Sequence, residues 1–385
     1  MRIAMVGPFG FHPKKTMRAR AFRLAREMVA DGHDVALFMP PWHTPEVAGR
    51  RWTEDGVAIT YVAVQAGTVG ISRALLRATL AFRPDVVHCF KPKAYSGLVA
   101  WWLWQRRRHE LRIIVDSDDW EGWGGWNNHA PYSPLQKRFF GWQERWGLRR
   151  HHALTVASRT LQSLAWAHGA APELVHYLPN GPGIVPGTPA TTRRESLGLA
   201  ERPVLLLYSR LFEFGAERLI AVLQRVHAAL PDLAILAVGA GLYEDDSVEL
   251  RQHLETTGLD RLLVDAGWVD EAELPELLAA ADVGLYLMDD NLLNRAKCPV
   301  KLADMLAVGV PVVAEAVGQV PEYVVHRETG LLRASGDADG LAKDLIRLLT
   351  DSQQRRWLGQ QAAARMAGCF SWRRLTAIAL EAYQL

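Results

Sequence analysis

The chain has few cysteines, little net charge and no long apolar run, and each shortage argues against a class of protein. Only three of its 385 residues are cysteines, at positions 89, 298 and 369. Their odd number and wide spacing argue against a disulfide framework and a cysteine-ligated metal site. A formal net charge of +2 is too small for a protein that binds nucleic acid through its overall charge. The most apolar run, residues 97–104, is far shorter than the ~20 residues that a membrane-spanning helix needs.

The N-terminal segment also lacks the features of a secretory signal. Residues 1–7, MRIAMVG, predict a first strand that runs into a loop. They have neither the long apolar stretch nor the small-residue cleavage site of a signal peptide. Together with the few cysteines, this favours a cytoplasmic protein and leaves peripheral contact with the inner face of a membrane open.

Short apolar segments alternate with amphipathic ones along the chain, which is the pattern of a parallel sheet covered on both faces. A chain of 385 residues suits two domains of roughly 150–200 residues each. We predict an α/β protein with one doubly wound domain over residues 1–182, a second over residues 183–370, and a C-terminal helix over residues 371–385. A Pro/Gly-rich linker, residues 179–189, separates the two domains. Ligands of such domains bind beyond the carboxyl ends of the strands.

The predicted strands follow the short apolar runs. In the first domain they are residues 3–6, 35–38, 57–62, 86–89, 113–115 and 154–157, and in the second residues 204–208, 233–238, 262–265, 283–287 and 310–314. A first helix is predicted over residues 17–30, with Thr16 as its N-cap and Gly32 as a left-handed residue that closes it.

A segment near residue 300 combines positive charge with a predicted helix start. It reads KCPVKLADMLAVGVPVVA, and Pro299 suits the first turn of a helix. Free amides and the helix dipole favour an anion at such an N-terminus, and Lys297 and Lys301 add charge beside them. Asp304 follows Lys301 by three residues, and its carboxylate can accept hydrogen bonds from sugar hydroxyl groups.

This segment resembles the P-x-K-L-x-E-x-M-A-x-G-x-P-V-V-A signature of the family-4 retaining glycosyltransferases, with Asp304 at the second acidic position. Other segments resemble further motifs of that family in the expected order: YLPNG at 177–181, SRL at 209–211, GAG at 239–241, AGWV at 266–269, and Gly318, Glu322 and Gly330. The resemblance covers nearly all of the second half and, more loosely, the first 180 residues. It implies a GT-B fold, in which two Rossmann-like domains face a cleft.

The resemblance also implies residue roles for a nucleoside-diphosphate sugar donor. Arg210 and Lys301 would hold the diphosphate, Asp304 would bind the ribose, and the backbone near Val269 would meet the base. No metal and no further cofactor is implied. A Gly-Gly pair often reaches the diphosphate after the first strand of this family, but residues 7–16 here read GPFGFHPKKT. Gly10 and Lys15 are the donor-binding candidates of that loop, although an ordinary polar loop is an equal alternative.

Two donor-side positions depart from the family pattern. Ala296 stands eight positions before Asp304, where the family has the first of two glutamates. Either Asp289 or Asp290 replaces that acid, or nothing does. The lysine that follows G-R-L in the family is missing from residues 212–215, and Lys297 is the candidate to supply the lost charge.

Carboxylates after the predicted strand at residue 115 provide candidates for the acceptor side. Asp116, Asp118 and Asp119 form a pattern that binds a metal–diphosphate in the other large glycosyltransferase fold, GT-A, through oxygen ligands. Here they lie in the half that does not bind the donor. We therefore interpret them as catalytic candidates facing the acceptor. His88, in a segment that resembles the P-D-V-V-H strand of the family, is a further catalytic candidate, with a structural role equally favoured.

An aromatic stretch follows these carboxylates. Three tryptophans at positions 120, 123 and 126 lie among glycines, and they suit either carbohydrate recognition or loop anchoring. Residues 133–150 predict a helix with an apolar stripe beside a cationic one. The stripes are Leu135, Phe139, Trp142 and Trp146, and Arg138, Arg145 and Arg149. Such a helix can dock on an anionic membrane, although packing on its own domain is the commoner arrangement.

By this resemblance the chain is expected to transfer a sugar with retention to a glycan, a lipid-linked saccharide or a small molecule, as in polysaccharide biosynthesis. The leaving phosphate would help to take the acceptor proton, so no protein nucleophile is expected. Two alternatives are a GT-B nucleotide-sugar epimerase and a catalytically silent binder of nucleotide sugars. A dinucleotide oxidoreductase is disfavoured because residues 7–10 lack the G-x-G-x-x-G spacing. No nucleic-acid partner is expected.

Overall fold

The structure of the protein is a computed structural model that describes residues 1–65, 67–185, 187, 193–239 and 244–384. The contacts divide the chain into two compact units. Unit 1 consists of Met1–Asn180, Ala296–Cys298 and Trp372–Leu385, and unit 2 of Gly181–Arg295 and Pro299–Ser371. The division after Asn180 falls in the predicted linker, whereas the assignment of Ala296–Cys298 to unit 1 was not predicted.

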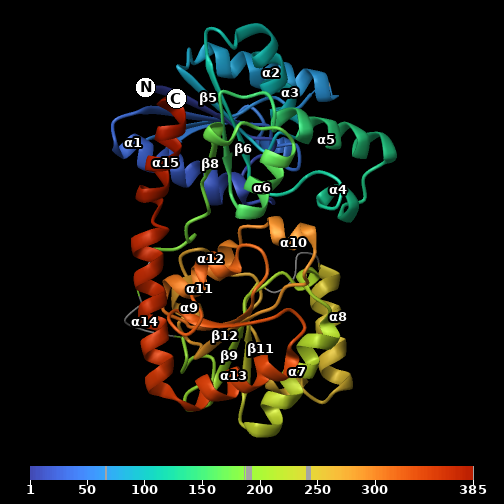
Figure 1. The fold of residues 1–385 in the computed structure, drawn as a ribbon, viewed down its shortest axis with the longest axis vertical. Coiled ribbons are helices and arrows are strands. Elements are labelled where there is room, and N and C mark those ends of the chain that lie inside the picture. Colours follow the sequence, from blue (N-terminus) through green and yellow to red (C-terminus); the bar gives the residue numbers. More distant parts are fainter. Residues whose placement is uncertain (66, 186, 188–192, 240–243, 385) are drawn as a thin grey trace. The chain divides into compact units, whose positions relative to one another are not determined.

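Unit 1 contains an eight-stranded sheet in the order β3-β4-β2-β1-β5-β6-β7-β8 (Figure 1). Its strands are β1 (Arg2–Val6), β2 (Asp34–Met39), β3 (Arg51–Glu54), β4 (Val57–Tyr61), β5 (Val86–Phe90), β6 (Arg112–Ser117), β7 (Ala153–Val156) and β8 (Val175–Tyr177). All neighbours are parallel except β3 and β4, which are antiparallel. The prediction located the central strands and missed β3 and β8.

Helices cover both faces of this sheet. Successive side chains of β1 point to opposite faces and are buried on both, which requires this cover. They are α1 (Arg23–Ala30), α2 (Gly67–Ala81), α3 (Ala94–Arg107), α4 (Trp126–His129), α5 (Pro134–Gly147), α6 (Arg159–Ala167) and α15 (Trp372–Gln384), with short turns η1 (Met17–Phe22), η2 (Pro45–Val47) and η3 (Pro172–Leu174). Ile3 and Met5 pack in one core cluster with residues of η1, α1 and α15. Ala4 and Val6 pack in another with residues of α2 and α3. The C-terminal helix therefore completes the core of unit 1.

The first predicted helix begins differently from the prediction. Residues 17–22 form the π-helical turn η1, which continues into α1. Thr16 has helical backbone angles and its side chain makes no capping hydrogen bond, so its predicted capping role is wrong. Gly32 has a φ of 83°, and the left-handed residue predicted after this helix is thus confirmed.

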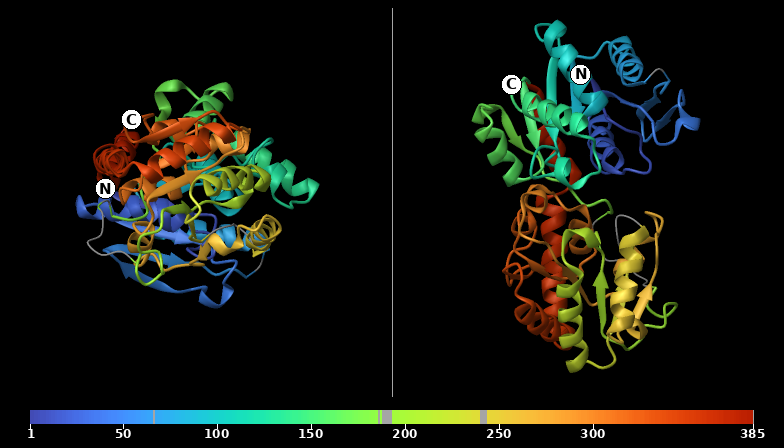
Figure 2. Two further views of the ribbon diagram at one scale, coloured as in Figure 1. Left: turned by 90° about the horizontal axis from the view of Figure 1, so that it is seen from below. Right: turned by 90° about the vertical axis from the view of Figure 1, so that its right-hand side faces the viewer.

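Unit 2 contains a six-stranded parallel sheet in the order β11-β10-β9-β12-β13-β14. Figure 2 shows helices beside the strands of this unit. The strands are β9 (Val204–Leu207), β10 (Ala234–Ala237), β11 (Leu263–Asp265), β12 (Val283–Tyr286), β13 (Val312–Glu315) and β14 (Gly330–Arg333). The prediction missed only β14 among these. Both units thus have the doubly wound α/β architecture that the sequence predicted.

The helices of unit 2 pack on both sides of its sheet. They are η4 (Leu211–Glu213), α7 (Ala216–Ala229), α8 (Glu244–Thr256), η5 (Asp260–Leu262), α9 (Leu274–Leu278), α10 (Leu292–Ala296), α11 (Val300–Ala307), α12 (Val320–Tyr323), α13 (Ala338–Thr350) and α14 (Ser352–Cys369). The predicted helix near residue 300 is α11, which begins one residue after Pro299. Within the described ranges, no helix combines the length and apolar character required to cross a bilayer.

Candidate functional site

In unit 2, Lys301 joins two loops at the carboxyl edge of the sheet. It lies in the first turn of α11. Its ammonium donates to the Gly239 carbonyl oxygen at 2.6 Å and to the Ser209 carbonyl oxygen at 3.3 Å. The same ammonium lies 4.5 Å from the centroid of the Tyr208 ring. These loops follow β9 and β10, so the lysine stands where parallel α/β sheets bind their ligands.

Arg210 belongs to the same loop as the Ser209 carbonyl that Lys301 binds. Its side chain is exposed, and it forms no ion pair with any residue in the described part of the chain. The structure therefore brings the two predicted diphosphate ligands onto segments that are hydrogen-bonded to each other. An exposed guanidinium beside an ammonium suits a bidentate anion such as phosphate.

Asp304 is held by neighbours in the structure. Its side chain is 3% exposed, and its carboxylate accepts hydrogen bonds from the Gly183 amide at 2.6 Å and from the Tyr208 hydroxyl at 3.4 Å. The carboxylate thus anchors the segment that follows unit 1, while its predicted ribose contact stays a prediction. Val269 is half-buried in the loop after β11. That loop is tied to the β10 loop by the Gly239 amide, which donates to the Gly267 carbonyl at 2.7 Å.

Both candidates for the missing acid at position 296 are ion-paired. The Asp289 carboxylate lies 2.7 Å from the Arg218 guanidinium, and the Asp290 carboxylate binds Arg295. Each carboxylate is 45% exposed, so neither is sealed from a ligand. Ala296 itself is fully buried. The replacement of the family's first acid therefore stays a prediction.

Lys297 does not belong to the unit that holds Arg210 and Lys301. It lies in the Ala296–Cys298 segment of unit 1, is 5% exposed, and has its ammonium 5.7 Å from the centroid of the Trp126 ring. Hydrogen bonds fasten this segment, because Asn180 donates to Cys298 and the Ser158 hydroxyl donates to the Ala296 carbonyl. The predicted diphosphate contact of Lys297 has no geometric support within unit 1.

In unit 1, Asp116 and His88 belong to a fully buried polar network. Arg20 binds the Asp116 carboxylate with two nitrogens, at 2.9 and 2.7 Å, and Thr155 donates to it at 2.6 Å. The two ring nitrogens of His88 lie 2.8 Å from the Tyr383 hydroxyl and 3.1 Å from the Thr155 hydroxyl. Burial lowers the pKa of His88 to about 4. Although burial opposes it, the Arg20 charge holds the pKa of Asp116 below its usual value.

The catalytic roles predicted for His88 and Asp116 are therefore corrected. Both side chains are 0% exposed in unit 1, and their polar atoms are engaged by Arg20, Thr155 and Tyr383. A group without surface cannot touch a substrate. These two residues instead connect β5 and β6 to η1 and α15 through a satisfied network in the core.

Asp118 and Asp119 lie closer to the surface and share one lysine. The Lys91 ammonium lies 3.0 Å from Asp118, 2.9 Å from Asp119 and 3.3 Å from Glu121. Burial raises the pKa of Asp118 to about 7, against the opposing charge of Lys91. Asp119, whose side chain is 20% exposed, is the more accessible of the two predicted carboxylates. Lys93 binds Glu121 and donates to the Tyr132 hydroxyl at 2.8 Å.

Sequence reasoning missed the two lysines and Glu121, which binds both of them. Lys91 and Lys93 directly follow the apolar strand β5, at the edge where ligands of a parallel sheet bind. This Lys-Pro-Lys sequence was the available signal. Glu144 was also missed: it is 1% exposed on α5, and burial and the Glu121 charge raise its pKa to about 8. No sequence signal marked it, because Glu144 lies on the side of α5 opposite the predicted apolar stripe.

Gly10 and Lys15, the candidates of the loop after β1, differ in their surroundings. A Cβ on Gly10 would lie 3.2 Å from the Tyr61 ring, and the Tyr61 hydroxyl accepts from the adjacent Phe11 amide at 2.9 Å. The packing of Tyr61 thus explains the glycine within unit 1. Lys15 is exposed in the same loop. The donor contacts predicted for Gly10 and Lys15 stay predictions.

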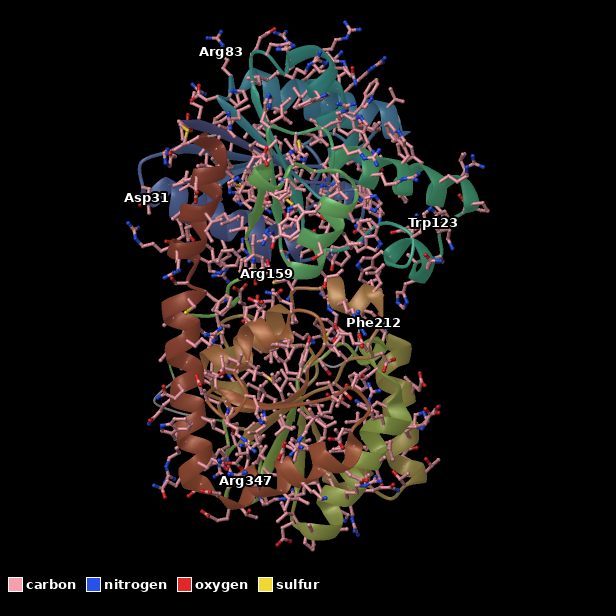
Figure 3. All side chains as sticks on the ribbon, in the orientation of Figure 1. Asp31, Arg83, Trp123, Arg159, Phe212 and Arg347 are labelled. Carbon is pink, nitrogen blue, oxygen red and sulfur yellow. The ribbon has the colours of Figure 1, made fainter. Side chains whose placement is uncertain are left out.

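The tryptophan loop combines anchoring and exposed residues. Trp120 is 5% exposed and donates to the Trp123 carbonyl at 2.8 Å, so it anchors the loop. Trp123 is 50% exposed and lies beside α5 (Figure 3). The buried Asn127 donates to the Lys137 carbonyl at 2.7 Å, which ties the loop to α5.

We call the exposed side of α5 together with Trp123 the α5 surface. It lines a depression of ≈ 540 Å³ formed by Trp123, Leu135, Arg138, Phe139, Trp142 and Arg145. The Ser133 hydroxyl and the Gln136 side chain cap each other's backbone amides at the start of this helix, which confirms the predicted helix opening. Trp146 departs from the predicted stripe, because it packs against the core cluster of α2 and α3.

Two family descriptions match most of the chain. "Glycosyl transferase 4-like domain" matches residues 15–181, and "Glycosyl transferases group 1" matches residues 202–351. Apart from Gly181, the first match lies in unit 1, and apart from Ala296–Cys298 the second lies in unit 2. Among the described residues, no group of three or more histidine, cysteine, aspartate and glutamate side chains is placed to hold a metal ion.

Characterised relatives match about half of the chain. A GDP-mannose-dependent monoacylated alpha-(1-6)-phosphatidylinositol monomannoside mannosyltransferase of Corynebacterium glutamicum is 32% identical over 228 residues, which are 56% of this chain and 58% of the relative. An N-acetyl-alpha-D-glucosaminyl L-malate synthase of Bacillus anthracis is 29% identical over 45% of this chain and 43% of its own length. The chain thus spans only about half the length of the relatives it matches.

Solved structures share the fold over the whole chain. Sucrose-phosphate synthase of Thermosynechococcus elongatus has a TM-score of 0.76 at 19% identity and covers 100% of this chain and 98% of its own. Anabaena Alr3699/HepE, solved with UDP-glucose, has a TM-score of 0.76 at 19% identity and covers 100% of both chains. At this identity the likeness concerns the fold alone.

Proposed function

Because the chain belongs to the glycosyltransferases of the GT-B type, with a glycosyl transferase 4-like domain before a group 1 domain, we propose that it transfers a sugar from a nucleoside-diphosphate sugar. One observation carries this proposal: Lys301 is hydrogen-bonded to the loop that presents the exposed Arg210. Two cations at the carboxyl edge of a parallel sheet suit the diphosphate of the donor. Contacts that strengthen as the diphosphate leaves would contribute to rate as well as to binding.

The proposed reaction is retaining and independent of a metal ion. The acceptor hydroxyl attacks the face from which the diphosphate departs, and the leaving phosphate takes its proton. The matched mannosyltransferases are described as GDP-mannose-dependent and act on phosphatidylinositol monomannoside, so GDP-mannose is the first donor to test and a lipid-linked saccharide the first acceptor. A glycan or a small molecule is the alternative acceptor, as the N-acetyl-alpha-D-glucosaminyl L-malate synthase among the relatives suggests.

A donor panel tests the proposal against its rivals. The protein is incubated with GDP-mannose, UDP-glucose and UDP-N-acetylglucosamine, and released nucleotide and remaining sugar nucleotide are measured. Slow release of nucleotide supports a transferase. When an acceptor is added, the anomeric proton spectrum of the glycoside that forms tests retention. An epimerised donor would identify an epimerase, and binding without turnover a silent binder. Lys343→Met is the matched control for Lys301→Met, because Lys343 is exposed on α13 in the same unit.

We further propose that the α5 surface docks on an anionic membrane, which places the reaction at the cytoplasmic leaflet. Leu135 is 78% exposed and Trp142 39% exposed, which is unusual for large apolar side chains. Arg138 and Arg145 are exposed on the same helix, and Arg149 is exposed just after its end. Apolar and aromatic side chains beside arginines suit the boundary between acyl chains and anionic headgroups.

Vesicle sedimentation tests this contact. We expect the protein to sediment with vesicles that contain phosphatidylglycerol and not with vesicles of pure phosphatidylcholine. Leu135→Ser with Trp142→Ser should reduce binding by about tenfold, because each loses apolar contact with the acyl boundary. Trp357→Ser is the matched control, since Trp357 is 46% exposed on α14 in unit 2. Equal binding by all three proteins would contradict membrane docking by this surface.

A further inference from the structure

Four loops of unit 1 meet at the carboxyl edge of its sheet. They follow β1, β2, β5 and β6, and they carry Lys14, Trp42, Lys93 and Glu121 respectively. The electrostatic neighbours of Lys14 are Lys93, Lys91 and Glu121, which places these charges close together. Loops at this edge form the ligand site in doubly wound folds.

Lys14 stands against two aromatic rings. Its ammonium lies 5.4 Å from the centroid of the Phe9 ring and 5.7 Å from that of the Trp42 ring. Trp42 is fixed by a 3.1 Å hydrogen bond from its indole to the Pro8 carbonyl, and its ring stacks on His43 at 3.4 Å. Both rings therefore lie near the ammonium, and the residue stays exposed.

The carboxylates of this edge are already bound by the other two lysines. Lys91 binds Asp118, Asp119 and Glu121, and Lys93 binds Glu121 as well. Lys14 forms no ion pair with any residue that the structure describes. Its ammonium is therefore not directly paired with a described carboxylate.

The surroundings of Lys14 disfavour its protonated form. The pKa of Lys14 is lowered, first by partial burial of the ammonium and then by repulsion from Lys93. Lys91 lowers it further, and the attraction of Glu121 offsets only part of the effect. An anion placed beside Lys14 would relieve this repulsion, because an opposite charge favours the protonated amine.

We propose that Lys14, held between Phe9 and Trp42 and beside Lys93, is a subsite for a phosphate group of the acceptor. The proposal rests on the proposed function, because it names a chemical feature of the molecule that receives the sugar. It differs from the donor site, whose cations Arg210 and Lys301 belong to unit 2. The phosphate can come from a soluble phosphate ester or from a lipid headgroup.

Calorimetry with a minimal phosphate ester tests this subsite. Glycerol 3-phosphate and uncharged glycerol are titrated into the wild-type protein, Lys14→Met and Lys343→Met. We expect wild type and Lys343→Met to bind glycerol 3-phosphate in preference to glycerol, and Lys14→Met to bind it about tenfold more weakly, the effect of one lost charge-assisted contact. Unchanged binding by Lys14→Met would overturn the proposal.

A titration with GDP and UDP separates this inference from the proposed function. Lys14→Met should keep the wild-type affinity for whichever nucleotide binds, and Lys301→Met should lose affinity for that nucleotide while keeping its affinity for glycerol 3-phosphate. If Lys14→Met weakens nucleotide binding as strongly as it weakens ester binding, the acceptor subsite is refuted. If the wild type binds no nucleotide but still binds the ester through Lys14, the donor proposal alone fails.

Vesicles distinguish the two sources of phosphate. Binding to phosphatidylcholine vesicles with and without phosphatidylinositol is compared for wild type and Lys14→Met. A loss in Lys14→Met on the phosphatidylinositol vesicles supports a lipid headgroup as the source. A loss only with soluble glycerol 3-phosphate supports a soluble acceptor. Equal binding of the two proteins both to phosphatidylinositol vesicles and to soluble glycerol 3-phosphate contradicts the subsite.

Discussion

The carboxyl edges of the two sheets hold their lysines in different ways. In unit 1, Lys91 and Lys93 bind the carboxylates of Asp118, Asp119 and Glu121. In unit 2, Lys301 donates to two backbone carbonyl oxygens. A carboxylate neutralises the charge of a lysine, whereas a neutral carbonyl orients the ammonium and leaves its charge in place. The second arrangement is therefore suited to binding an anion.

The comparison also separates structural from functional polar groups. The network of Arg20 and Asp116 in unit 1 is satisfied and fully buried. Arg210 in unit 2 is exposed and unpaired among the described residues. A buried pair contributes to the fold through its partners, and removal of one member leaves an uncompensated charge. An exposed cation is available to a ligand and contributes little to the stability of the fold.

The largest effect is expected where the charges are most buried. Arg20→Met should lower the free energy of unfolding by about 3–5 kcal/mol, because the Asp116 carboxylate then remains buried without its cation. Chemical denaturation of the purified protein measures this change. Adding Asp116→Leu to Arg20→Met should recover part of the loss. If Arg20→Met alone is as stable as wild type, the network does not have the structural role assigned to it.

A substitution in unit 2 should affect binding rather than folding. Lys301→Met should weaken nucleoside-diphosphate binding by about 1.5–3 kcal/mol, the range for a hydrogen bond to a charged group. Thermal unfolding without ligand should change little, since the Lys301 hydrogen bonds are to neutral carbonyls. A large loss of thermal stability with unchanged nucleotide affinity would reverse the distinction between the two edges.

A third effect should depend on pH. Burial and the Glu121 charge raise the pKa of Glu144 to about 8, from an ordinary value near 4.5. Between these values the folded protein keeps a proton that the unfolded chain releases, so stability falls as the pH rises from about 5 to about 8. Glu144→Gln should flatten this decline. The free energy of unfolding of both proteins is measured by denaturation at several pH values between about 5 and about 8. If it changes with pH in the same way for wild type and Glu144→Gln, the Glu144 carboxyl is ionised in the folded protein throughout this range.

The strands that could be predicted are those buried on both faces. Continuous apolar runs mark the central parallel strands because both faces are covered by helices. Strand β3, RWTE, is at the sheet edge and alternates exposed with half-buried side chains, so it has no such run. Strand β8 has only three residues. Short edge strands depend on pairing with a neighbour, which local sequence does not encode.

The two sites were predictable to different degrees for a related reason. Lys301 and Asp304 lie in one local motif whose helix start is visible in the sequence. The partners of Asp116 come from far along the chain, since Arg20 is 96 residues away and Thr155 is 39. Only the fold shows that this carboxylate is buried by them rather than directed at a substrate. Long-range polar networks are thus the part that a single sequence does not reveal.

Isothermal calorimetry of nucleoside diphosphates with wild type and Arg210→Ala tests the donor site in unit 2. At least one of GDP, UDP and ADP should bind the wild-type protein, and Arg210→Ala should weaken this binding by about tenfold or more while the fold stays intact. Unchanged affinity in Arg210→Ala, or no nucleotide binding by the wild type, would contradict this donor site.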